Sequence, residues 1–111
     1  MDEQNELVSV AMQIILNAGN ARNSATDALA AAKTFDFVLA EQNLKEAEES
    51  ITKAHKAQTE IIQSEAGGHS YAYSLLFTHA QDTLMTINSE VRLTKEMIDV
   101  LKIIHNKTEA N

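Results

Sequence analysis

Apolar residues recur every three or four positions along most of the chain, which is the spacing of one face of an α-helix. In the first third the repeating positions are Leu7, Val10 or Ala11, Ile14, Ala18, Ala21, Ala25, Ala28 and Ala32. They predict a first helix over about residues 3–33. Gly19 stands among asparagines, which are poor helix formers, so we expect a kink or a frayed turn there.

A second stripe follows a short polar break. Thr34 and Asp36 can each cap a helix, because their side-chain oxygens accept hydrogen bonds from the free amides of the first turn. The positions that repeat after this break are Phe37, Ala40, Leu44, Ala47, Ile51, Ala54 and Ile61, with Gln58 interrupting the stripe. We predict a second helix over about residues 36–65, ended by a left-handed glycine turn at Gly67 and Gly68.

The last third of the chain carries two stripes on one predicted helix, over about residues 71–106 with Ser70 as its cap. The stripe that we assign to the core reads Tyr73, Phe77, Ala80, Leu84, Ile87, Val91, Ile98 and Leu101. The other reads Leu75 or Leu76, His79, Asp82, Thr86, Ser89, Met97, Val100 and Ile104, with apolar ends and a polar middle. One bundle needs only one apolar face per helix, so the second stripe predicts self-association.

Three long helices with two short connections predict an all-α fold, an antiparallel three-helix bundle in a single domain over residues 1–111. The chain has no cysteine, which excludes disulfides and thiolate chemistry. No apolar run approaches the ~18 residues of a membrane helix, and the first residues lack the positive charge of a secretory signal. We therefore expect a soluble cytoplasmic protein without membrane insertion. The net charge of −7 argues against nucleic acid as a partner.

Histidine is the residue type in this chain that is best suited to metal binding or catalysis. None of the four histidines follows a glutamate by three residues, the spacing that di-iron bundles use, so we do not expect a ferritin-like metal core. His55 lies between two lysines, His69 lies in the glycine break and His105 lies near the end of the third helix. We interpret these three as plain surface residues.

His79 differs because Asp82 follows it by three residues, on the same helical face. Such pairs are common, and the histidine is often only half-buried and satisfied by a neighbour. Asp82, however, interrupts an apolar stripe with no Lys or Arg within four residues, so its carboxylate must be paired, protonated or bound to a cation. Imidazole transfers phosphoryl groups well near neutral pH, which makes His79 a candidate phosphohistidine. The chain has no phosphate-binding glycine loop with which to take phosphate from ATP unaided.

The segment Leu75–Thr86 contains the run His-Ala-Gln-Asp-Thr-Leu-Met-Thr, and it resembles the IIA component of the lactose/cellobiose family of the phosphoenolpyruvate-dependent sugar phosphotransferase system (PTS). Further similar stretches occur in the same order at residues 18–22, 36–37, 54–59 and 65–67. The chain departs from the family pattern at Lys33-Thr34-Phe35, which lacks the glycine expected before Asp36. This difference concerns the turn between the first and second predicted helices.

The resemblance implies a subunit of a homotrimer, in which His79 accepts a phosphoryl group from phospho-HPr and passes it to the cysteine of a IIB component. The sugar, a β-linked disaccharide such as cellobiose, chitobiose or lactose, enters through the membrane component IIC. Ala80 in the motif favours cellobiose or chitobiose. Asp82 would lie where three subunits meet and bind a divalent cation, Mg²⁺. Gln81 would point about 200° away from His79, and the start of the third helix would lie too far from His79 to help hold phosphate.

Two other interpretations stay open. The first is a histidine phosphotransfer module of two-component signalling, although such modules favour a lysine where this chain has Asp82. The second is a non-catalytic helical adaptor, in which His79 and Asp82 only fix the register of an oligomer.

Overall fold

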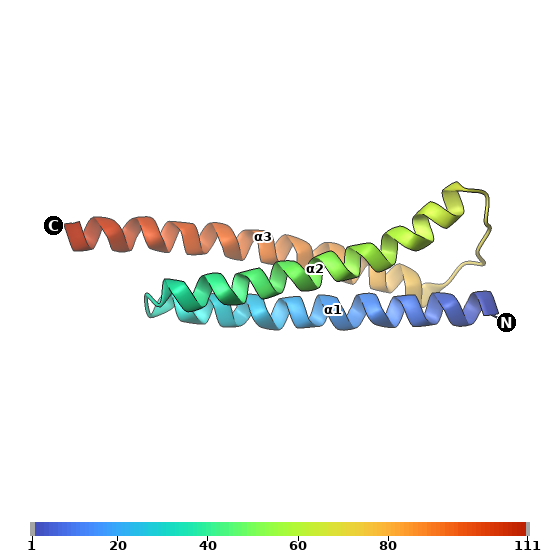
Figure 1. The fold of residues 1–111 in the computed structure, drawn as a ribbon, viewed down its shortest axis with the longest axis horizontal. Coiled ribbons are helices and arrows are strands. Elements are labelled where there is room, and N and C mark those ends of the chain that lie inside the picture. The colour runs from blue at the N-terminus through green and yellow to red at the C-terminus, as the bar shows by residue number, and fades with distance from the viewer. Residues whose placement is uncertain (1, 111) are drawn as a thin grey trace.

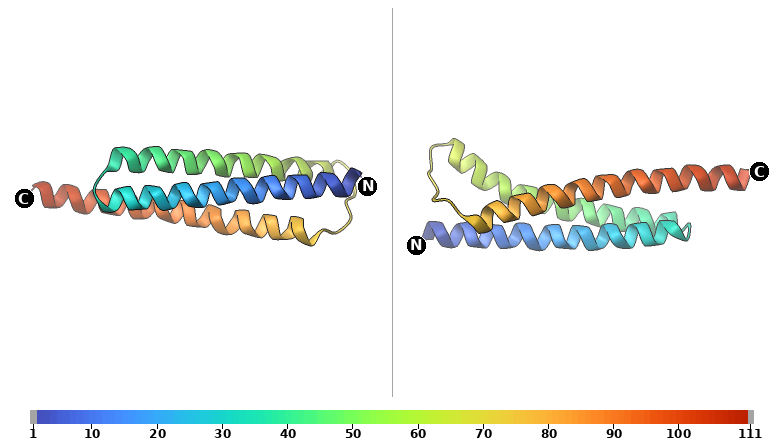
Figure 2. Two further views of the ribbon diagram at one scale, coloured as in Figure 1. Left: turned by 90° about the horizontal axis from the view of Figure 1, so that it is seen from below. Right: turned by 180° about the vertical axis from the view of Figure 1, so that it is seen from behind.

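The computed structural model describes residues 2–110, with the side chains of residues 4–109. Its elements are the helices α1 (Asp2–Lys33), α2 (Phe37–Ala66) and α3 (Leu75–Ala110). They lie side by side in a rod of 64 × 20 × 18 Å (Figure 1). α2 runs antiparallel to both other helices, and α1 and α3 are parallel (Figure 2). The predicted all-α antiparallel three-helix bundle is confirmed, and residues 2–110 contain no strand.

The predicted stripes form the core. α1 contributes mainly alanines, which let the other helices approach closely, and the largest side chains with almost no exposed surface are Ile14, Leu84, Ile87 and Ile98. Burying a side chain of that size stabilises the fold by roughly 1.5–3 kcal/mol. None of the helices within residues 2–110 has an apolar stretch long enough to cross a membrane.

The turn between α1 and α2 contains no glycine, and Phe35 takes the left-handed conformation instead, with φ of 65°. The Asp36 N–H donates to the carbonyl of Ala31, which is the pattern that usually ends a helix with glycine. A side chain in this conformation costs roughly 1–2 kcal/mol. The ring of Phe35 stacks on His105 of α3 with 4.4 Å between centroids, which offsets part of that cost. Asp36 is confirmed as the cap of α2, because its carboxylate accepts from the Leu39 N–H.

Two expectations about helix interiors and ends are wrong. α1 runs as one helix through Gly19, without the predicted kink or frayed turn, because the flanking Ala18 and Ala21 are fully buried and keep that stretch packed (Figure 1). α3 continues to Ala110 and projects beyond the α1–α2 turn (Figure 1). His105 is therefore half-buried in a contact with Phe35 and is not a plain surface residue.

The connection between α2 and α3 is longer than predicted. Gly68 has a φ of 105° and the next amide, of His69, donates to the carbonyl of Ser64, so the glycine turn is confirmed. Residues 69–74 are not helical, and α3 begins at Leu75 rather than near residue 71. Ser74, not Ser70, is the cap, since its Oγ accepts from the Phe77 N–H at 3.1 Å.

Tertiary contacts explain this late start of α3. The Tyr71 hydroxyl lies 3.1 Å from Ser64 Oγ and 3.4 Å from the Glu6 carboxylate, which holds the linker (residues 67–74) against α2 and α1. Tyr73, predicted to face the core, is 79% exposed. Because the linker is not helical, α3 begins about one helical turn later than the apolar pattern indicates.

Candidate functional site: His79 on the outward face of α3

His79 is exposed and is the fifth residue of α3. The sequence placed it about nine residues into the helix, and that expectation is wrong because α3 starts late. Side chains of a helix lean toward its N-terminus, so the imidazole leans over the first turn of α3. In that turn the amides of Phe77 and Thr78 are engaged by Ser74. The positive end of the helix dipole is therefore close to His79, contrary to expectation.

Asp82 lies one turn further along and is also exposed. At ~100° per residue, His79 and Asp82 fall within about 40° of one line along α3 that also contains large apolar side chains. Their exposed fractions are 72% for Leu75, 63% for Leu93, 44% for Met97, 52% for Val100 and 54% for Ile104. We call this set, with His79 and Asp82, the outward stripe. The bundle of a single chain leaves the outward stripe uncovered.

Neither His79 nor Asp82 has a hydrogen bond or ion pair with another of residues 4–109. The side chains in that range also form no group of three or more His, Cys, Asp or Glu that could hold a metal ion. On the outward stripe, residues 4–109 therefore offer a free imidazole and one free carboxylate, but no complete metal site.

Gln81 lies on a different side of α3 from His79. It lines a small, mainly polar cavity of about 170 Å³, together with Thr78, Tyr71 of the linker and Ile61 of α2. His79 does not line this cavity. The placement agrees with the helical geometry that directs Gln81 away from His79 within one chain.

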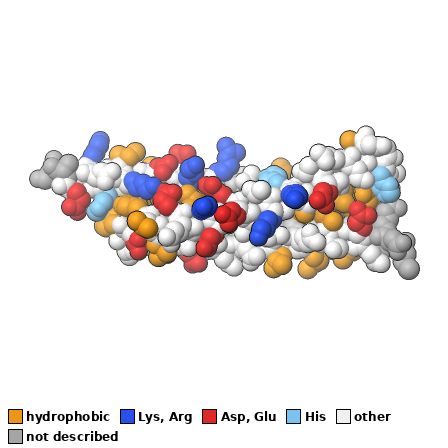
Figure 3. Space-filling model, viewed as in Figure 1, with side chains coloured by type: hydrophobic (Ala, Val, Ile, Leu, Met, Phe, Trp, Pro, Cys, Tyr) orange, Lys and Arg blue, Asp and Glu red, His pale blue; other side chains and the backbone are white. Residues whose placement is uncertain are grey.

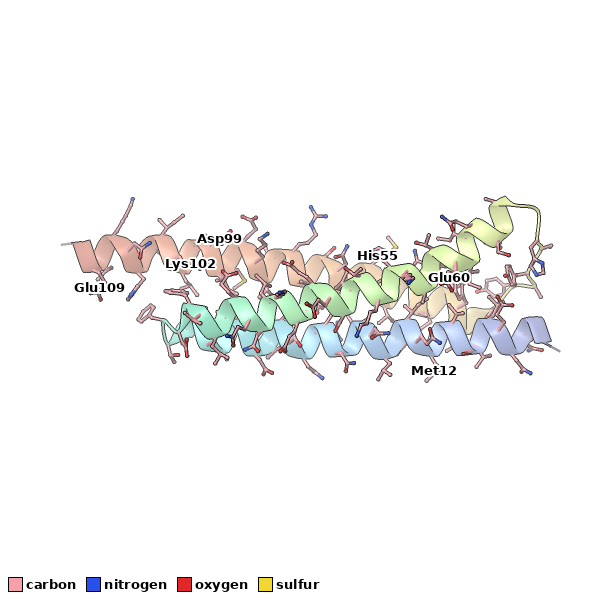
Figure 4. All side chains as sticks on the ribbon, viewed as in Figure 1. Met12, His55, Glu60, Asp99, Lys102 and Glu109 are labelled. Carbon is pink, nitrogen blue, oxygen red and sulfur yellow. The ribbon has the colours of Figure 1, made fainter. Side chains whose placement is uncertain are left out.

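α1 also carries large apolar side chains that are exposed in the bundle. Met12 projects from α1 on the side away from α2 (Figure 4), and it is 52% exposed. Val8 and Leu16 are 43% and 65% exposed. α1 and α3 run in parallel, so this part of α1 accompanies the first turns of α3.

An ion pair joins α1 to α3 further along the bundle, and the sequence did not indicate it. Arg22 donates to both carboxylate oxygens of Glu90 at 2.8 Å. These hydrogen bonds, opposed by desolvation and helped by charge attraction, lower the pKa of Glu90 below its usual range. The same contact raises the pKa of Arg22. The two residues are 68 positions apart, so no local spacing could have revealed the pair.

Two of the other histidines lie as predicted. His55 is exposed on α2 (Figure 4), and His69 is exposed next to Tyr71 of the linker. Among the histidines, only His79 combines exposure with a neighbouring free carboxylate and a place on the outward stripe.

The fold and the site thus define a class: a three-helix bundle with a histidine and an aspartate, unpaired among residues 4–109, on an uncovered helix face. Residues 9–102 match the family described as "PTS system, Lactose/Cellobiose specific IIA subunit". The chain is 42% identical over 106 residues to the lichenan-specific phosphotransferase enzyme IIA component of Bacillus subtilis, and the match covers 96% of each chain.

Solved structures agree with this match. The cellobiose-specific enzyme IIA of the PTS from Bacillus anthracis has a TM-score of 0.85 at 42% identity, over 91% of this chain and 93% of that one. The IIA(Chitobiose) chain of a solution structure with HPr has a TM-score of 0.79 at 33% identity, over 89% and 96% of the two chains. The chain belongs to the lactose/cellobiose-specific IIA family of the PTS. This membership decides against the two-component interpretation.

Proposed function

We propose that this protein is a cytoplasmic phosphocarrier, in which His79 accepts a phosphoryl group from phospho-HPr and passes it to the cysteine of a IIB component. The observation that carries the proposal is an exposed imidazole, without a partner among residues 4–109, in a chain of the IIA family. A related IIA protein has been solved in complex with HPr, which supports HPr as the donor.

The proposed chemistry consists of two displacements at phosphorus. A ring nitrogen of neutral His79 attacks the phosphoryl group, the new P–N bond forms, and the bond to the donor histidine breaks with its electron pair going to the donor ring. A IIB thiolate then attacks the same phosphorus, and the electron pair of the P–N bond returns to His79. The exposed position of His79 gives both partners access.

We further propose that the outward stripe assembles three copies into a homotrimer, with His79, at the edge of the stripe, staying accessible. Its apolar side chains would leave water on assembly, at ~25 cal/mol per Å² of apolar surface. The stripe would bring one Asp82 from each subunit together. Carboxylates that converge repel one another unless they share protons or bind a cation.

Mg²⁺ fits this proposed arrangement by its chemistry. It prefers hard oxygen ligands, and Asp82 supplies a carboxylate that no other side chain of residues 4–109 binds. The side chains of residues 4–109 form no group of three possible metal ligands within one chain, so Asp82 of three subunits would be needed. The cation would supply positive charge that neutralises the three carboxylates.

We propose a β-linked disaccharide as the sugar whose uptake this carrier serves. The relatives are named for lichenan, cellobiose, chitobiose and lactose. In this scheme the IIA component never touches the sugar, which the membrane component IIC would carry.

The test is phosphorylation with phosphoenolpyruvate, enzyme I and HPr, followed by intact mass and site mapping at neutral to alkaline pH. We expect one acid-labile phosphoryl group per subunit, carried on His79. His79→Gln should abolish it, whereas the matched variant His55→Gln, at another exposed helical histidine, should be phosphorylated normally. If the folded wild-type protein is not phosphorylated, the phosphocarrier proposal is wrong and the adaptor interpretation replaces it.

A further inference from the structure

The start of α3 has two possible positions in the sequence. Ser70 and Ser74 are both suitable caps, and residues 71–73 between them include no glycine or proline that would oppose a helix. A helix capped by Ser70 would take in this segment and would be about one turn longer. In the folded chain Ser74 is the cap, and its Oγ accepts from the Phe77 N–H at 3.1 Å.

Tyr71 holds the linker in its non-helical form. Its hydroxyl lies 3.1 Å from Ser64 Oγ of α2 and 3.4 Å from the carboxylate of Glu6 on α1. If α3 were extended back to residue 71, Tyr71 would lie within about 40° of Leu75 on the outer side of the helix, at ~100° per residue. It would then face away from α1 and α2 and lose both contacts. These contacts therefore oppose the longer helix.

The position of this helix start matters for His79 because its end of the rod lacks basic side chains. Residues 1–21 and 57–91 contain no Lys or Arg, and they include the start of α1, the end of α2, the linker and the start of α3. On the face drawn in Figure 3, this right-hand end shows acidic, histidine and hydrophobic side chains, and Lys and Arg lie over the rest of the rod. The positive end of the α3 dipole is then an important source of attraction for a phosphoryl group on His79.

One turn of helix changes this attraction. With α3 beginning at Leu75, His79 is the fifth residue and its imidazole leans over the first turn. With α3 beginning at residue 71, His79 would be the ninth residue, and the positive end would lie about 6 Å further away along the helix. The dipole acts mainly within the first turn, and a phosphoryl group carries about two negative charges. The longer helix would therefore hold the phosphoryl group less firmly.

We propose that Tyr71 is a positioning residue for phosphoryl transfer: its hydroxyl makes α3 begin at Leu75 and so keeps the positive end of the helix beside phosphorylated His79. This proposal rests on the phosphocarrier function and adds a residue that controls how firmly the phosphoryl group is held. Tyr71 acts through the start of α3, because it lines the polar cavity on the Gln81 side of the helix, which His79 does not line.

The equilibrium of phosphoryl exchange with HPr reports this role. Exchange with HPr breaks one P–N bond and forms another, so its equilibrium constant measures how strongly His79 holds the group relative to the donor. A change that only lowers the stability of the fold leaves this constant unchanged as long as the protein stays folded. A positioning role and a merely structural role are thus distinguishable.

The experiment mixes phospho-HPr with the full chain and measures the distribution of the phosphoryl group at equilibrium by intact mass. Tyr71→Phe removes only the anchoring hydroxyl, and Tyr73→Phe is the matched control, since that side chain is 79% exposed. Ser64→Ala removes the partner of the hydroxyl and leaves Tyr71 in place. NMR chemical shifts of residues 70–74 show whether the linker is helical in each protein.

We expect residues 71–74 to become helical in Tyr71→Phe, with the equilibrium constant for transfer to His79 lowered about threefold to tenfold. Ser64→Ala should act in the same direction, and Tyr73→Phe should match the wild type. Adding Ser70→Ala to Tyr71→Phe should reverse both changes, because alanine is a poor cap for the longer helix.

Three results would overturn the proposal. If the linker stays non-helical in Tyr71→Phe, the hydroxyl does not set the start of α3. If the linker becomes helical and the equilibrium constant does not change, the position of the start does not matter for His79. If Tyr71→Phe and Tyr73→Phe shift the equilibrium equally, the effect is not due to the anchored hydroxyl. A wild-type protein that is not phosphorylated at all would instead remove the phosphocarrier function, and this proposal with it.

Discussion

The two faces of α3 differ in what they require from outside the chain. The inward face, with Ala80, Leu84, Ile87, Val91 and Ile98, is buried by α1 and α2 and is complete within one molecule. The outward stripe is equally regular along the helix, but its apolar side chains are 44–72% exposed. His79 and Asp82 lie on that uncovered face.

Folding and function therefore depend on different faces of the same helix. The centres of the two faces lie roughly 140° apart at ~100° per residue, so a substitution on one face need not disturb the other. The inward face determines whether α3 joins the bundle. The outward stripe, by our proposal, determines what the folded subunit binds and transfers.

The largest expected effect is on assembly. Leu93→Asp places a charge in the outward stripe, so the proposed trimer should dissociate to monomers that remain helical, because Leu93 is 63% exposed in one chain. Light scattering and circular dichroism measure this. Val38→Asp, on α2 and off the stripe, should leave the mass unchanged, and a Leu93→Asp protein with wild-type mass would contradict assembly through the stripe.

The next effect is on the inward face. Leu84→Ala should lower the free energy of unfolding by about 2–5 kcal/mol, because it opens a cavity at a side chain with no exposed surface. Met85→Ala changes the adjacent residue, which is 64% exposed, and should cost about 0.5 kcal/mol or less. Urea unfolding at one protein concentration measures both. Similar losses would mean that position 85 is also buried in the assembled protein.

A smaller effect is expected at Asp82. Asp82→Leu removes the converging carboxylates, so the melting temperature should rise by several degrees in the presence of a chelator and should no longer respond to added Mg²⁺. Asp82→Asn should lose the same response with a smaller gain. An unchanged response to Mg²⁺ in both variants, measured by thermal unfolding, would place the cation elsewhere.

The smallest effect concerns the ion pair between α1 and α3, which flanks the outward stripe. The pKa of Glu90 is lowered in the folded protein, so its contribution to stability is present above the ordinary glutamate pKa of 4.5 and is lost as pH falls through the folded value. Glu90→Gln should therefore destabilise slightly at neutral pH and not in acid. High salt should shrink the difference, since both side chains are largely exposed.

Most of the fold could be predicted because one residue spacing governs it. The buried positions of α1 and α2 follow the predicted stripes, and the breaks at Asp36 and Gly68 follow from capping chemistry. The start of α3 could not be predicted, because Ser70 and Ser74 are both suitable caps. The choice between them depends on contacts of Tyr71 with residues of α1 and α2.

The site was predictable only in part. The spacing of His79 and Asp82 and the motif around them indicated a pair on one face, and the structure places both on the outward stripe. The contacts of His105 and Arg22 join residues about 70 positions apart, and local patterns contain no information on them. Tyr73 was wrongly assigned to the core because the apolar pattern of α3 was extended backwards into a linker that is not helical.

The most direct test of the proposed phosphocarrier role is a chase experiment with the phosphorylated protein. The protein labelled on His79 is freed of enzyme I and HPr, mixed with an equal amount of a IIB component, and both chains are followed by intact mass. We predict that the phosphoryl group leaves His79 and appears on the IIB cysteine, and that IIB with this cysteine replaced by serine leaves it on His79. A phosphoryl group that stays on His79 in the presence of intact IIB would contradict a carrier.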